Sequence, residues 1–163
     1  MQSLSHLCQR KRLSRGFTLL ELVIVAGIIG IIASVITLPF LTFRQQTLLG
    51  VGAEDIVTTL NKARLGTMAS KGGLQYGVHL QDDRIVLFQG ASYSSTAVTN
   101  EVRLLDSHLT LSSIVVNGGG SDILFDFFTG ATSNNATTTL SVVGRPQASS
   151  TIVVRPSGVV YLD

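Results

Sequence analysis

The sequence predicts an α+β protein in which a long N-terminal helix packs on a small antiparallel β-sheet head. Three observations support this prediction. Residues 17–43 are almost wholly apolar, residues 44–72 repeat apolar side chains at helical spacing, and residues 73–163 alternate short apolar segments with turn sequences. We expect the first two segments to form one continuous helix, half of it in a membrane and half in the head.

A basic leader, residues 1–16, precedes the predicted helix. Four of the 12 Lys and Arg residues and the single cysteine, Cys8, lie in it. Without the leader, 8 basic residues face 10 acidic ones, so the net charge is 8 − 10 = −2 and no disulfide or cysteine-based metal site can form. A basic cluster beside a membrane span is expected to stay in the cytoplasm, which places the head outside.

The apolar segment 17–43 predicts a transmembrane helix, because it is longer than the roughly 20 residues that cross a bilayer core. It is too long for a secretory signal peptide. A plain signal anchor fits the length but does not explain Glu21, the only charged residue in the segment, since a carboxylate costs about 2.5–3.5 kcal/mol at the membrane centre. Pro39 is predicted to kink the helix near its outer end, because proline lacks the backbone donor.

The junction of leader and helix carries a specific pattern. It reads Arg15-Gly16-Phe17-Thr18-Leu19-Leu20-Glu21-Leu22-Val23-Ile24-Val25. This pattern resembles the processing motif of type IV prepilins. The resemblance implies that a prepilin peptidase cuts between Gly16 and Phe17, and that Phe17 becomes the N-methylated N-terminus. It also implies that Glu21 pairs with the Phe17 ammonium of a neighbouring subunit and sets the register of assembly.

The same resemblance implies the partners of the chain. These are other pilin or pseudopilin subunits, the prepilin peptidase, the inner-membrane assembly platform and the lipid bilayer. The location implied is the inner membrane, crossed once, and later a pilus or pseudopilus.

Residues 44–72 are expected to continue the helix as an amphipathic segment. Its apolar positions are Leu48, Val51, Ile56, Leu60, Ala63 and Leu65. Gly50 and Gly52 weaken this prediction, because each glycine costs a helix about 1 kcal/mol relative to alanine. The helix should end near Ser70, since Lys71-Gly72-Gly73 is a stop signal.

The head is predicted to be a set of short strands. Their expected ranges are 74–80, 85–89, 102–105, 109–116, 123–128, 138–143, 152–154 and 159–162. The first two should form a hairpin through residues 81–84, and the last two should be joined by the turn at residues 155–158.

A second pattern lies in the head. Ile123-Leu124-Phe125-Asp126 is followed by Gly130, and Thr151-Ile152-Val153-Val154 is followed by Gly158-Val159-Val160. This order resembles the subgroup formed by pseudopilin H and the minor pilin FimT, in which a late apolar strand precedes a final hairpin around a glycine.

The head offers little that indicates chemistry. Beyond the leader, the only histidines are His79 and His108, and neither lies in a known catalytic or metal-binding motif. His79 is expected at the surface or at a sheet edge. We therefore expect no enzyme activity, catalytic residue, cofactor or metal site. DNA is weighed as a partner but not favoured, because the C-terminal region offers only Arg145 and Arg155, whereas phosphate binding needs several convergent cations.

Three functions remain open at this point. The first is a minor pilin of a type IV pilus, acting in initiation or at the tip. The second is an H-type pseudopilin of a type II secretion system that aids protein export. The third is a membrane-tethered binding domain that does not polymerise and keeps its leader.

Overall fold

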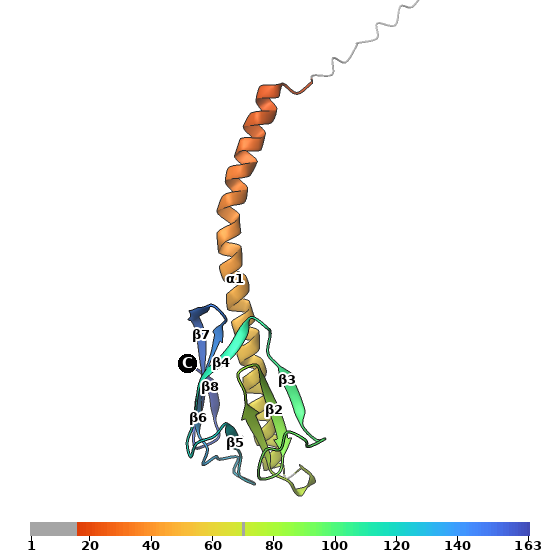
Figure 1. The fold of residues 1–163 in the computed structure, drawn as a ribbon, viewed down its shortest axis with the longest axis vertical. Helices are drawn as coiled ribbons and strands as arrows, with labels where there is room; N and C mark the ends of the chain where they lie inside the picture. Colours follow the sequence, from red (N-terminus) through yellow and green to blue (C-terminus); the bar gives the residue numbers. More distant parts are fainter. Residues whose placement is uncertain (1–15, 70) are drawn as a thin grey trace, which may run out of the picture. The chain divides into compact units, whose positions relative to one another are not determined.

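One helix, α1, extends from Leu19 to Met68 (Figure 1). The computed structural model describes residues 16–69 and 71–163, except for the side chains of residues 36–42 and 71. The chain forms two compact units, one up to Phe40 and one from Leu41 onward, and α1 contributes to both. The helix continues through Gly50 and Gly52, and it ends close to the predicted Ser70.

A short 3₁₀ turn, η1 (Lys71–Gly73), follows the helix. Gly72 and Gly73 both have a φ of 69°, in the left-handed region that only glycine adopts without strain. The predicted stop signal therefore ends the helix by the expected mechanism.

The second half of α1 packs through a stripe of apolar side chains. The buried residues at spacings of three and four are Leu49, Ala53, Ile56, Leu60 and Ala63. The prediction was wrong for Val51 and Leu65, whose exposed fractions are 64% and 62%. Each lies two positions from a stripe residue, and two positions rotate a helical side chain by about 200°, to the opposite side.

The strands form two antiparallel sheets, where the sequence predicted one. The first has the order β3-β2-β1-β5 and is made of Glu101–Leu104, Arg84–Gln89, Tyr76–Leu80 and Asp122–Leu124. The second has the order β4-β6-β7-β8 and is made of Leu109–Val116, Ala136–Val142, Arg145–Val154 and Val160–Leu162. A single sheet does not form because β5 returns to pair with β1, whereas β4 pairs with β6. The α+β class, with a long helix on antiparallel strands, is confirmed.

Two strands differ clearly from their predicted ranges. β5 ends at Leu124 because the chain then turns, with the Gly130 N–H donating to the Asp126 carbonyl at 3.0 Å. β7 begins at Arg145, well before the predicted residue 152. Its first part pairs with β6 at Arg145 and again from Ser149 onward, with an irregularity between them, and β8 reaches only as far as Ile152. This part is therefore incompletely paired and accepts polar residues. Because these residues are polar, the sequence did not indicate a strand here.

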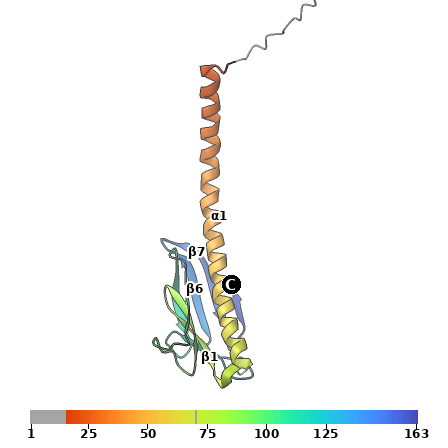
Figure 2. The ribbon, with the colours of Figure 1, turned by 90° about the vertical axis from the view of Figure 1, so that its right-hand side faces the viewer.

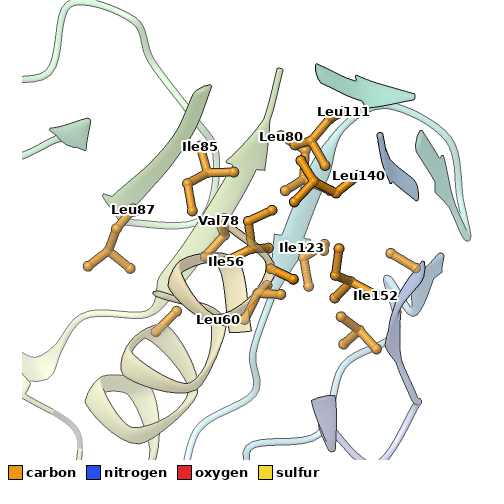
Figure 3. Close-up of a cluster of buried hydrophobic side chains, with 14 of the residues drawn as sticks. Ile56, Leu60, Val78, Leu80, Ile85, Leu87, Leu111, Ile123, Leu140 and Ile152 are labelled. Carbon is orange, nitrogen blue, oxygen red and sulfur yellow. The ribbon is translucent and has the colours of Figure 1, made fainter. Parts of the chain in front are cut away.

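The core lies between the second half of α1 and the two sheets (Figure 2). Figure 3 shows Ile56 and Leu60 of the helix among side chains of both sheets. The other labelled members are Val78, Leu80, Ile85, Leu87, Leu111, Ile123, Leu140 and Ile152. Each such side chain contributes about 1.5–3 kcal/mol when fully buried, so this shared core stabilises both sheets and the helix together.

Candidate processing and assembly site

The predicted cleavage site lies at the start of α1. Thr18 directly precedes the helix, and its Oγ1 accepts a hydrogen bond from the Glu21 backbone N–H at 3.2 Å. The Leu22 N–H donates to the Thr18 carbonyl at 3.2 Å. Thr18 is therefore the N-cap residue of α1, with Glu21 at the third helical position. The sequence analysis did not single out Thr18, although Thr-x-x-Glu is a known helix-start signal that could have identified it.

The bond between Gly16 and Phe17 lies in irregular chain just outside the helix. Phe17 has an exposed fraction of 80%, and a side chain added at Gly16 would meet no atom within 4 Å. Glu21 is also exposed, one helical turn from Phe17. The structure thus brings Gly16, Phe17, Thr18 and Glu21 together at one helix end, open to a peptidase or a neighbouring chain. The side chain of Pro39 and the leader residues 1–15 lie outside the described residues.

The first part of α1 exposes a large apolar surface. The exposed side chains include Leu19, Leu20, Leu22, Val23, Ile24, Val25, Ile28, Ile29, Ile31, Ile32 and Val35. Contiguous apolar surface of this extent marks a site of contact with other proteins or with lipid. Among the residues that the structure describes, there is no helix both long enough and apolar enough to span a membrane.

His79 lies on an inner strand, so the expectation of a sheet-edge position was wrong. β1 pairs with β2 on one side and with β5 on the other. The His79 Nδ1 lies 2.5 Å from the Asp122 Oδ1, and its ring stacks on Tyr93 at 3.9 Å between centroids. The stacking of Tyr93 on His79 holds the loop after β2 against the sheet. Within the described parts of the chain, no three His, Cys, Asp or Glu residues are grouped so as to hold a metal ion.

The two C-terminal arginines do not converge. Arg145 is the first residue of β7, and Arg155 directly follows its last. The two arginines thus lie at opposite ends of β7. Arg155 lies over the Tyr161 ring at 5.1 Å, and the Arg145 Nη1 donates to the Gln45 Oε1 at 3.1 Å. No joint phosphate site follows from these positions.

The glycines of the head pattern lie against each other. Gly130 and Gly158 have φ values of 62° and 74°, and a side chain on Gly158 would overlap the Gly130 carbonyl. The same carbonyl accepts a hydrogen bond from the Arg64 Nε of α1 at 3.1 Å. The glycines therefore allow the loop after β5, the β7–β8 turn and the helix to meet at one point.

Comparison with known proteins identifies the N-terminal region. Residues 11–37 match the family described as the prokaryotic N-terminal methylation motif. The match contains Gly16, Phe17 and Glu21. Among curated proteins, no significant match to the chain is found.

Solved structures with a similar fold include a minor pilin and a minor pseudopilin. One is the type IV minor pilin FimU of Pseudomonas aeruginosa, with a TM-score of 0.56 and 12% identity, covering 74% of this chain and 92% of that one. Another is the minor pseudopilin EpsH from the type 2 secretion system of Vibrio cholerae, with a TM-score of 0.54 and 15% identity, covering 71% of this chain and 95% of that one. The helix that begins with the methylation motif thus continues into a fold that is similar to the folds of this minor pilin and this minor pseudopilin.

Proposed function

We propose that this chain is a minor pilin, cut by prepilin peptidase after Gly16 and assembled into a type IV pilus through its N-terminal helix. The observation that carries this proposal is the methylation motif at the start of α1. Before assembly, the subunit crosses the inner membrane once, with its leader in the cytoplasm and its head outside. Initiation of the pilus or a place at its tip suits a subunit of this kind.

The proposed assembly step uses two charges created or exposed by processing. Cleavage gives Phe17 a free amino group, which stays positive after methylation. Because Phe17 and Glu21 are both exposed at the helix end, the amino group of one subunit can reach the carboxylate of the next. In an apolar bundle the pair sets the register of the helices, since an unpaired buried charge is costly.

N-terminal sequencing of the protein from cells with and without prepilin peptidase tests the proposal. We expect a methylated Phe17 at the N-terminus in the first strain and the intact leader in the second. An intact leader in both strains would contradict processing. It would favour the third possibility, a tethered binding domain that does not polymerise.

A second candidate function is supported by the fold shared with EpsH, a pseudopilin of a secretion system. In that role the subunit would join a short pseudopilus that aids protein export. Deletion of the gene discriminates the two functions. Loss of surface pili with normal export supports the pilus, whereas loss of exported proteins with normal pili supports the secretion system.

A further inference from the structure

Two turns of the head, the β6–β7 turn and the turn before β4, are joined by a backbone hydrogen bond. The β6–β7 turn consists of Val143 and Gly144, and Gly144 has a left-handed φ of 78°. The Val143 N–H donates to the carbonyl of His108, in the turn before β4, at 2.8 Å. Because Val142 pairs with Arg145 across the turn, the backbone of Arg145 is fixed at this end of the second sheet.

The first residues of the head's helical part lie against the same turns. The Arg145 Nη1 donates to the Gln45 Oε1 at 3.1 Å, so Arg145 contacts the residue that follows Arg44 in the chain. Arg44 and Gln45 line a small pocket together with His108 and Val142. A neighbouring open groove of about 620 Å³ lies between Gln46 and the turn that begins β7. This space is of the size that holds a small ligand or a headgroup.

Arg44 and Arg145 supply positive charge at this end of the head. One carboxylate near them, Asp106, accepts hydrogen bonds from the backbone N–H and the ring Nδ1 of His108, both at 2.8 Å, and it lines a separate pocket together with Glu54 and Asp55. These bonds, with smaller contributions from the His108 and Arg44 charges, hold the pKa of Asp106 below its usual range. Asp106 is thus already engaged by His108. Arg145 uses one of its five N–H donors on Gln45, which leaves donors for an oxyanion.

Apolar side chains accompany these arginines. Phe43, which directly precedes Arg44, has an exposed fraction of 67%, and Val143, two residues before Arg145 in the β6–β7 turn, has an exposed fraction of 57%. Phe43 is the last residue of the apolar segment, and Arg44 follows it directly. Exposed apolar residues next to arginines are typical of surfaces that lie in the interface of a membrane, where the apolar groups enter the lipid and the cations meet headgroups.

We propose that Arg44 and Arg145 bind the phosphate groups of anionic phospholipids on the outer face of the inner membrane, with Phe43 and Val143 in the interface. This inference rests on the proposed membrane stage of the subunit. The contact holds the head against the bilayer before assembly, and extraction into the filament breaks it. Anionic lipid therefore slows the release of the subunit from the membrane into the filament.

An environment-sensitive fluorophore at the β6–β7 turn tests the contact. It is attached to Val143→Cys in a full-length Cys8→Ser chain, reconstituted in phosphatidylcholine vesicles with or without phosphatidylglycerol. We expect a blue shift, and quenching by lipids that carry a quencher near the headgroup, only with phosphatidylglycerol. A fluorophore at Ser157→Cys, in the turn at the far end of β7, should not respond.

Arginine variants test whether Arg44 and Arg145 cause the lipid response. Arg44→Gln and Arg145→Gln should each reduce docking of the turn about fivefold, the equivalent of the roughly 1 kcal/mol that one cation contributes at an anionic surface. Arg155→Gln is the matched control, because it removes the same charge at the opposite end of the same strand. Equal losses in all three variants, or no response to phosphatidylglycerol, would overturn the inference.

A third label separates this inference from the proposed function. A fluorophore at Ile28→Cys reports whether the apolar segment enters the bilayer. Insertion at Ile28 without a lipid response at Val143 would refute only the headgroup contact. If the fluorophore at Ile28 also stays outside the bilayer, the proposed membrane stage is wrong, and the headgroup contact is refuted together with it.

Discussion

At the scale of single residues, the assembly site depends on how Thr18 and Glu21 share the first turn of α1. The Thr18 hydroxyl satisfies the backbone N–H of Glu21 at 3.2 Å. The backbone at Glu21 is thereby fixed by the cap, whereas its carboxylate remains exposed for a partner. The resemblance to prepilins identified Glu21 from the sequence. The role of Thr18 emerged only from the geometry, although its spacing to Glu21 was visible.

Glu21→Val should leave cleavage nearly intact, since the proposed cut depends on Gly16 and Phe17, but it should reduce entry into filaments. If the unpaired Phe17 ammonium costs about 3 kcal/mol, incorporation falls about a hundredfold. Immunoblots of sheared filaments against whole cells measure the ratio. Glu54→Val, in the same helix but in the head, is the control. Normal incorporation of the Glu21→Val subunit would refute the role in register.

Gly158 carries a second residue-level prediction. Gly158→Ala combines a left-handed φ of 74° with overlap of the Gly130 carbonyl, which should lower the free energy of unfolding by about 2–5 kcal/mol. Gly144→Ala is the matched control. Its φ is 78°, but a side chain there meets no atom within 4 Å, so we expect a loss of only about 1 kcal/mol. Urea unfolding of both proteins gives the comparison, and equal losses would show that crowding at Gly158 is unimportant.

At the scale of elements, two glycines of α1, Gly50 and Gly52, differ in how closely the helix packs at their positions. Gly52 faces the second sheet, and a side chain there would lie 2.6 Å from the Leu109 Cδ1 and 3.1 Å from the Leu140 Cδ2. Gly50 is exposed, with nothing within 4 Å of an added side chain. The two glycines looked alike in the sequence, as residues that weaken the helix. Only Gly52 is needed for the close approach of helix and sheet.

Gly50→Ala should therefore raise the free energy of unfolding by about 1 kcal/mol, the difference in helix propensity between the two residues. Gly52→Ala gains the same propensity, but it must displace Leu109 and Leu140, so its net effect should be zero or destabilising. Thermal unfolding of the two variants beside the unaltered protein measures both. A similar stabilisation by the two substitutions would mean that the helix does not approach the sheet this closely.

Local signals predicted most elements, and non-local pairing explains what they missed. Gly72-Gly73 predicted the helix end, and short apolar segments between turn sequences predicted strands such as β4. The division into two sheets depends on β5 pairing with β1, far back in the chain, and no residue of either strand indicates it. The early start of β7 was concealed because its polar residues lie in an incompletely paired part of the strand.

At the scale of the whole molecule, the proposed cleavage after Gly16 would change the charge and leave packing as the main source of stability. Without residues 1–16 the chain has no cysteine and a net charge of −2. Its core joins α1 to both sheets, so the head should unfold as one unit. Exposed carboxylates that accept side-chain hydrogen bonds add local order at the turns. Examples are Asp83 with Arg84, where the Oδ1–Nε distance is 2.9 Å, and Asp106 with His108.

These turns predict how stability depends on pH. Hydrogen bonds from Arg84 and from His108 lower the pKa values of Asp83 and Asp106, respectively. Because both pKa values are lower in the folded state, each carboxylate stabilises the fold above its unfolded pKa of about 3.9, and this contribution is lost as the pH falls through the lower folded value.

The double variant Asp83→Asn and Asp106→Asn should therefore be less stable than the unaltered protein near pH 7, and the difference should shrink as the pH falls below about 4. Urea midpoints measured from neutral to acid pH give the two curves. Asp163→Asn, at the end of the chain, is a control that removes a carboxylate outside these turns. If the curves of the double variant and the unaltered protein stay parallel down to acid pH, the two turns do not contribute to folding through their charges, and the order they give to the head must come from backbone hydrogen bonds alone.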